Sequence, residues 1–148
     1  MTTLFAFLHH LLAFALVACI AIELVLVRQE LTLTTAKKLI RIDAVLGVCA
    51  GLLLIVGLSR VFWFEKGADY YWANHAFLTK FGVFIGIAVV SITPTVEFLT
   101  WRKAVRAGEV PQVEERTLRK LAAFLHCELV GIVVILLCAV VMARGGWV

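Results

Sequence analysis

Apolar residues along this chain come in four long runs that are separated by short polar segments. A helix that crosses a bilayer needs about 20 consecutive, mostly apolar residues, and each run reaches that length. Strands of a membrane barrel would instead alternate apolar and polar positions over about ten residues, and these runs do not alternate. The pattern predicts an all-α integral membrane four-helix bundle, with helices at about residues 4–27, 39–64, 76–101 and 121–143.

Composition argues against a water-soluble domain. Hydrophobic residues make up 63% of the 148 residues and charged residues 16%, whereas soluble domains have roughly 45–50% and 25%. A soluble fold of this length has too little interior to bury so much apolar surface, because surface outgrows core in small domains. We therefore expect one transmembrane domain over residues 1–148 that lies almost entirely in lipid.

The first apolar run contains Leu16-Val17-Ala18-Cys19, which resembles a lipoprotein cleavage site. A signal peptide starts with a positively charged region, but no Lys or Arg precedes this sequence. We therefore expect the first run to be a retained membrane helix.

The basic residues predict the orientation of the bundle. Four helices in up-down-up-down order place both termini on one side of the membrane and the first and third linkers on the other. Ten of the 14 Lys and Arg residues lie in or beside those two linkers. Because basic residues collect in cytoplasmic loops, we expect these linkers in the cytoplasm and both termini on the outer, periplasmic side. The same charges suit anionic lipid headgroups, and there is no exposed basic domain that would bind nucleic acid.

Ionisable groups inside the spans are costly in lipid and commonly functional, and here they form two layers. A rise of 1.5 Å per residue places His9, His10, Arg60 and Lys80 at similar depth, with His75 just above; we term these the outer layer. Imidazole can ligate haem iron, and cations pair with carboxylates such as haem propionates. The outer layer thus predicts a site for haem, a porphyrin or a quinone. Alternatively, both cations extend to the membrane surface and the histidines bond backbone or headgroups.

The inner layer is mostly acidic and consists of Glu23, Asp43, Glu97, His126 and Glu128. These groups predict either structural pairing with nearby arginines or a proton relay or cation site. At 100° per residue His126 and Glu128 point to opposite faces, so both cannot face the bundle centre. The Glu-x-x-His spacing of metal sites in helix bundles is missing.

Two further features bear on partners. The middle linker, residues 65–75, is rich in aromatic residues, which favour the headgroup level and predict an interfacial belt or a lid over a bound ligand. On the second predicted helix Gly47, Ala50 and Gly57 fall on one stripe. Small residues let helices approach closely in lipid, so this stripe predicts a packing seam.

The chain resembles a family of uncharacterised small four-helix bacterial membrane proteins. The resemblance covers nearly the whole chain and rests on His9-His10, Arg41-Ile42-Asp43, Lys66-Gly67 to Tyr70-Tyr71, Asn74, Phe77, Lys80, Ser91, Pro94-Thr95 and Trp101-Arg102. It implies a multi-pass protein of the bacterial inner (cytoplasmic) membrane.

That family is in turn distantly similar to HemJ-type protoporphyrinogen oxidases, which are four-helix haem-b membrane proteins. The similarity rests on a histidine early in the first helix that ligates haem in that family, here His9 or His10. Lys80 early in the third helix and Glu128 early in the fourth continue it. The tryptophan-glycine stretch of the family's first helix and a proline two residues after Glu128 are both missing. The similarity therefore implies bound haem b more than the protoporphyrinogen reaction itself.

The leading hypothesis is a haem-b-binding membrane redox protein that exchanges electrons with a quinone or porphyrin-like substrate near the outer leaflet. His9 or His10 would be the axial ligand of the haem iron, with His75 as a second ligand. Arg60 and Lys80 would hold the propionates or the substrate.

Protons in that reaction would be handled by Glu23 or Glu128. Whether the chain is an enzyme stays open at this point; if it is, we expect a membrane oxidoreductase related to HemJ-type enzymes.

Two alternatives belong to other functional classes. The inner layer fits a small proton- or ion-coupled transport protein without a cofactor, and the glycine stripe fits an assembly subunit of a membrane complex. Expected partners are membrane lipid and a second copy of the chain in a homodimer.

Overall fold

The computed structural model describes residues 2–64 and 75–144. In these residues the secondary structure is helical throughout: α1 (Thr2–Val27), α2 (Leu33–Ser59), the short π-helix η1 (Arg60–Phe64), α4 (His75–Arg106) and α5 (Glu115–Ala143). Four helical segments of the described chain are long and apolar enough to cross a membrane, namely Thr3–Val27, Leu33–Trp63, His75–Arg106 and Glu115–Ala143. The predicted all-α class with four candidate spans is confirmed.

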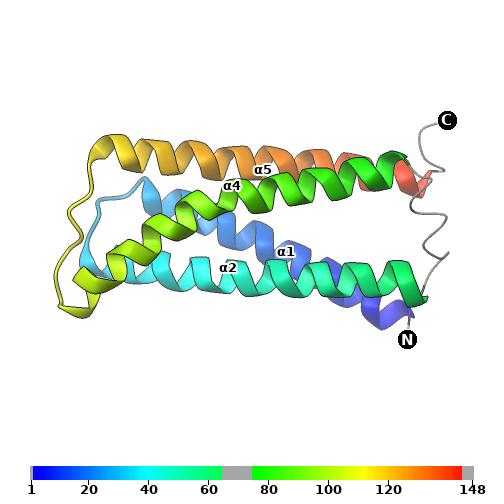
Figure 1. Ribbon diagram of the computed structural model, residues 1–148, viewed down its shortest axis with the longest axis horizontal. Helices are drawn as coiled ribbons and strands as arrows, with labels where there is room; N and C mark the ends of the chain where they lie inside the picture. The colour runs from blue at the N-terminus through cyan, green and yellow to red at the C-terminus, as the bar shows by residue number, and fades with distance from the viewer. Residues whose placement is uncertain (1, 65–74, 145–148) are drawn as a thin grey trace.

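The helices form a four-sided arrangement in which each long helix contacts two neighbours (Figure 1). Helix α1 packs on α2 and α4 on α5, and the two pairs meet where α1 contacts α5 and α2 contacts α4. Among the described residues the diagonal pairs, α1 with α4 and α2 with α5, make no such contacts. The centre of the bundle is therefore filled by side chains that approach from all four sides.

The two ends of the bundle differ in what they carry. The α1–α2 and α4–α5 connections, residues 28–32 and 107–114, lie together at one end, which we term the linker end (Figure 1). The start of α1, helix η1, the start of α4 and the end of α5 lie at the opposite, terminal end. The aromatic middle linker expected as a belt or lid falls almost entirely outside the described residues.

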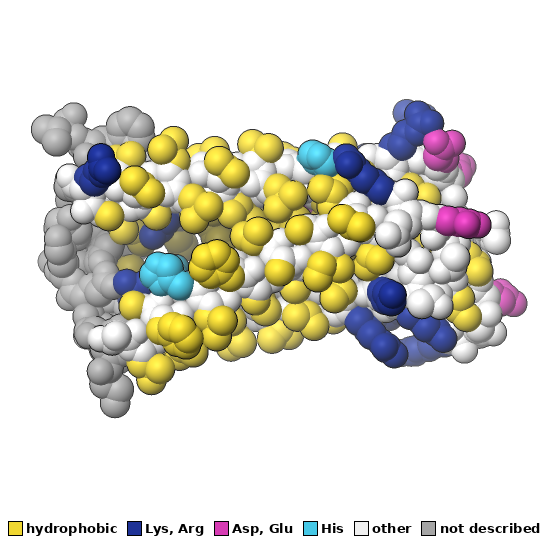
Figure 2. All heavy atoms as spheres, turned by 180° about the vertical axis from the view of Figure 1, so that it is seen from behind, with side chains coloured by type: hydrophobic (Ala, Val, Ile, Leu, Met, Phe, Trp, Pro, Cys, Tyr) yellow, Lys and Arg dark blue, Asp and Glu magenta, His cyan; other side chains and the backbone are white. Residues whose placement is uncertain are grey.

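The outer surface is apolar along the middle of the helices. Large side chains such as Phe14, Ile55, Val89 and Leu136 are more than half exposed, although soluble proteins rarely expose such continuous apolar patches. Figure 2 shows apolar side chains over the middle of the visible face and most of its Lys and Arg side chains near the linker end. An apolar belt between polar ends is the surface that a bilayer requires.

The most tightly packed part of the interior lies toward the linker end. Ile20, Leu39, Phe98 and Leu125 are at most 1% exposed. The Phe98 ring meets the Trp101 ring edge to face, with 5.0 Å between their centroids. Nearer the terminal end a smaller, separate cluster is formed by Val61 and Phe77, with Met142 packed against it.

Helix α2 begins at Leu33, earlier than the apolar run by itself suggests. The Thr32 side chain caps this start by accepting a hydrogen bond from the Thr35 backbone N–H at 3.1 Å, which satisfies an otherwise unpaired donor. Helix α4 continues to Arg106, and α5 starts at Glu115. Hydropathy marks the lipid-facing length, whereas the helices continue into the polar boundary beyond it.

The close approach of α4 to α5 depends on Gly131, and this yields a stability prediction. A β-carbon at Gly131 would lie 2.7 Å from side-chain atoms of Ile87, so Gly131→Val should lower the stability of the bundle by about 1–3 kcal/mol through overpacking. The matched control is Gly47→Val, because a β-carbon at Gly47 would have no atom of a neighbouring element within 4 Å. Thermal unfolding of both variants in detergent, followed by circular dichroism, checks the difference. Equal losses would contradict the close packing at Gly131.

Candidate functional site

Three carboxylates from three helices are buried inside the bundle. Glu23 on α1 is 0% exposed, Asp43 on α2 is 6% exposed and Glu128 on α5 is 1% exposed. They are close enough for each pair to interact electrostatically. We term Glu23, Asp43 and Glu128 the carboxylate cluster.

Helical periodicity explains why these carboxylates face inward. Positions three or four residues apart share a face of a helix, and each carboxylate continues a buried apolar stripe of its own helix. The buried stripes are Leu16, Ile20, Glu23 and Val27 on α1, Leu39, Asp43 and Leu46 on α2, and Leu121, Leu125, Glu128 and Ile132 on α5. Each acidic residue thus occupies a position where the pattern would accept an apolar one.

Helix α4 supplies hydroxyl and cationic groups to the same region. The Thr95 hydroxyl donates a hydrogen bond of 2.7 Å to Oδ1 of Asp43, and Arg102 is close enough to act on the same carboxylate. The Ser91 hydroxyl lies near Glu128. All four long helices therefore contribute polar groups to one level of the bundle.

The four carboxylate oxygens of Glu23 and Glu128 differ from those of Asp43 in their hydrogen bonding. None of these four atoms meets a hydrogen-bond partner within the described part of the chain, and Ser91 does not reach hydrogen-bond geometry. Buried polar atoms without partners are uncommon in proteins and commonly mark a bound water, an ion or a functional group. A buried, unpartnered carboxyl inside a membrane span is for the same reason a functional-site candidate.

Pro94 adds a backbone acceptor close to these groups. It is buried inside α4 and directly precedes Thr95. Because proline has no N–H, the carbonyl of Val90 loses its usual helical hydrogen bond. The Val90 carbonyl, about one turn before the Asp43–Thr95 contact, is therefore without this backbone donor.

The cluster is not arranged as a metal cage. No group of three or more His, Cys, Asp or Glu residues in the described ranges could hold a metal ion. What the arrangement can do is exchange protons, because carboxyl groups accept and donate them directly or through one water.

The rest of the predicted inner layer lies outside this cluster. The Glu97 carboxylate accepts a hydrogen bond of 3.0 Å from Nε1 of Trp101 on its own helix. The His126 side chain is exposed, while Glu128 is buried. The two side chains thus face in opposite directions, and it is Glu128 that faces the interior.

In the outer layer the structure separates the two adjacent histidines. His9 is half-buried and faces α2, where a β-carbon at Gly57 would lie 3.3 Å from its Cε1 atom. His10 is exposed, and its Nδ1 atom lies 2.7 Å from the backbone carbonyl of Ala6. His9 is therefore the histidine of this pair that faces the bundle.

The cations of the outer layer lie at the terminal end. Arg60 in η1 and Lys80 in α4 are half-buried, and His75 is exposed at the start of α4. The Nζ atom of Lys80 lies 5.5 Å from the centroid of the Phe77 ring. Phe77 packs with Val61, which directly follows Arg60, so the two cations occupy the same level of the bundle.

Thr95, which binds Asp43, is the cluster partner to which the sequence alone assigned no role. It appeared only as part of the Pro94-Thr95 pair in the family resemblance. Its signal in the sequence was its position directly after Pro94, in the half of the third span that lies on the same side of the membrane as Asp43 of the second span. Only the relative rotation of α2 and α4 brings the two side chains together.

Comparison of the chain with known proteins identifies one family. The model of the family described as "Predicted membrane protein (DUF2214)" matches residues 1–146. The chain belongs to this family. No curated protein and no solved structure matches the chain. Membership of the DUF2214 family confirms the expected membrane protein family, and none of the comparisons supports the similarity to HemJ-type enzymes.

The unpartnered carboxylates lead to a stability prediction. Glu23→Leu removes a buried group that has no hydrogen-bond partner, so it should raise the free energy of unfolding by about 1–3 kcal/mol. Asp43→Leu removes the acceptor of Thr95 and should lower it by a similar amount, about 1–3 kcal/mol. Thermal unfolding in detergent measures both changes. If Glu23→Leu destabilised the protein as much as Asp43→Leu does, the Glu23 carboxylate would have a stabilising partner, contrary to the structure.

Proposed function

We propose that this chain is a small proton-coupled transport protein that carries protons through the interior of its bundle. The observation that supports this is the carboxylate cluster, in which the oxygens of Glu23 and Glu128 are buried without hydrogen-bond partners. Ionisable groups in such positions mark proton relays in pumps and transporters. The chain keeps them on stripes where leucine would pack without a polar cost.

Each member of the cluster has a distinct part in this proposal. Glu23 and Glu128 exchange the transported proton, because their oxygens are free of competing hydrogen bonds. Asp43 is held by the Thr95 hydroxyl and fixes the position of the cluster between α2 and α4. Four helices that all contribute polar groups give the proton a route that stays inside protein rather than lipid.

The orientation belongs to the same proposal. Basic residues surround the connections at the linker end, and because such residues collect in cytoplasmic loops, the proposal has this end in the cytoplasm and both termini in the periplasm of a bacterial inner membrane. The cluster lies nearer the linker end, since Glu23 is one turn from the end of α1 at Val27. Protons would therefore exchange with the cytoplasm over the shorter distance.

Proton flux in liposomes tests this function. Purified protein in liposomes with an internal pH dye should speed pH equilibration under a potassium-diffusion potential. Glu23→Gln and Glu128→Gln should each slow it by about tenfold or more, because a group that transfers protons is lost. Glu97→Gln is the matched control, since this carboxylate is bonded to Trp101 of its own helix. Wild-type flux equal to that of empty liposomes, or an equal loss in Glu97→Gln, would overturn the proposal.

A second candidate function rests on the inward-facing His9 at the terminal end. In this proposal the terminal end would bind haem b, with His9 holding the iron and Arg60 and Lys80 pairing with the propionates. The donor set fits in part: His9 faces α2 and both cations are half-buried at one level. His10 points away from the bundle, which leaves His75 as the second ligand of the proposal.

Bound haem would supply one-electron chemistry, and the partner would be a quinone or porphyrin-like molecule at the outer leaflet. In this case the chain would act as a membrane oxidoreductase, and Lys80 would contribute to holding that partner. The carboxylates Glu23 and Glu128 would then serve as proton donors to the same reaction.

An absorption spectrum tests the haem proposal. Protein expressed with added haem should show a Soret band, which His9→Ala should remove because the inward axial ligand is lost. His10→Ala is the matched control and should keep the band, since this side chain is exposed. A wild-type protein without the band, or a band that survives His9→Ala, would exclude the proposed ligation.

A further inference from the structure

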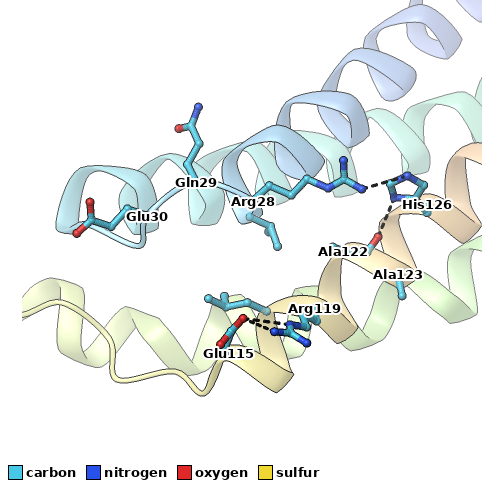
Figure 3. Close-up of a pocket in the computed structure, with 10 residues that line it drawn as sticks. Arg28, Gln29, Glu30, Glu115, Arg119, Ala122, Ala123 and His126 are labelled. Atoms are coloured by element: carbon cyan, nitrogen blue, oxygen red, sulfur yellow. Dashed lines mark hydrogen bonds and ion pairs between the residues drawn. The ribbon is translucent and has the colours of Figure 1, made fainter.

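A groove opens at the linker end between the end of α1 and the first turns of α5. It has a volume of about 700 Å³. Val27 and Leu118 form apolar parts of its lining, and Arg28, Glu115, Arg119 and His126 form polar parts. Figure 3 shows Arg28 reaching from the end of α1 toward His126, with Glu115 and Arg119 on the α5 side.

Arg28 has unused hydrogen-bonding capacity in this groove. Its NH2 atom lies 3.4 Å from Nε2 of His126, and Nδ1 of that ring lies 3.1 Å from the carbonyl of Ala122. A carbonyl only accepts, so Nδ1 carries the proton and Nε2 is the acceptor for Arg28. Within the described ranges no carboxylate lies at ion-pair distance from Arg28. A guanidinium has five N–H donors, so most of those on Arg28 stay available.

Arg119 is the second cation of the groove. Its Nε atom donates to Oε1 of Glu115 at 3.1 Å, one turn earlier on α5. Both side chains are 77% exposed, and an ion pair so exposed contributes little stability. An incoming anion can therefore replace Glu115 at low cost.

The position of the groove matches that of a lipid headgroup. The first span ends at Val27, and Arg28 directly follows it. The groove thus lies where the apolar belt meets the basic linker end, and Figure 2 shows this belt and this end on one face of the molecule. Basic pockets between membrane helices on the cytoplasmic side are sites for anionic headgroups.

We propose that this groove binds a phosphate ester group, with Arg28 and Arg119 as its two guanidinium donors. Arginine forks match phosphate oxygens with paired hydrogen bonds. The apolar lining at Val27 and Leu118 accommodates the glycerol and the first acyl carbons of an acidic phospholipid. A soluble phosphate compound offers the same anionic group without the apolar part.

Lipid binding by the purified protein tests the site. Native mass spectrometry in detergent should show more bound phosphatidylglycerol than phosphatidylcholine. Arg28→Gln and Arg119→Gln should each weaken phosphatidylglycerol binding by about fivefold, the loss expected for one basic residue near a headgroup. Arg106→Gln is the matched control, because Arg106 is an exposed arginine at the end of α4 that does not line the groove.

A second variant keeps both arginines and should strengthen lipid binding instead of weakening it. Glu115→Gln removes the carboxylate that Arg119 binds and should strengthen phosphatidylglycerol binding. Glu114→Gln removes the same charge one residue earlier, at a side chain that makes no capping hydrogen bond, and should change binding less. The comparison of Glu115→Gln with Glu114→Gln tests the site even if Arg28→Gln fails to fold.

The source of the phosphate is decided by competition. If millimolar inorganic phosphate leaves phosphatidylglycerol bound, the site takes the lipid; if it displaces the lipid, the site takes the phosphate group from water. Equal binding of phosphatidylcholine and phosphatidylglycerol, or equal losses in Arg28→Gln and Arg106→Gln, would overturn the proposal. So would weaker binding in Glu115→Gln.

Discussion

Lipid offers no hydrogen bonds to a polar group, so every such group inside the bundle must find its partner within the protein. The carboxylate cluster is where this constraint is most severe. Asp43 meets it through the Thr95 hydroxyl, whereas the oxygens of Glu23 and Glu128 do not meet it. Proteins tolerate such locally unfavourable positions mainly where function requires them. The apolar stripes around the cluster supply the packing that holds it in place.

The two ends of the bundle carry different chemistry. The linker end combines the tightly packed core around Phe98 and Leu125 with most of the basic residues of the chain. The terminal end has a small core of its own at Val61 and Phe77, beside the inward-facing His9. The proposed proton transfer at the carboxylate cluster and the proposed haem binding at the terminal end would therefore use different residues as proton carriers and as iron ligand.

The groove between α1 and α5 lies at the basic end of the bundle, where the apolar belt ends. Basic residues at a membrane boundary attract acidic headgroups, and Arg28 and Arg119 present this charge beside an apolar surface. A bound headgroup there would join the end of α1 to the start of α5, two helices that contact each other less extensively than α1 contacts α2. The proposed lipid site would thus support the side of the bundle that carries Glu23 and Glu128.

Hydropathy and helical period, both local properties, were sufficient to predict the four candidate spans and the opposite directions of His126 and Glu128. A run of about 20 apolar residues partitions into lipid whatever its neighbours are, and a residue's angle on its own helix depends only on its number. Three features were decided by the tertiary structure: that His9 rather than His10 faces inward, that Glu97 stays apart from the carboxylate cluster, and that Thr95 binds Asp43. These depend on how each helix is rotated against the next, which is set by side-chain packing between helices.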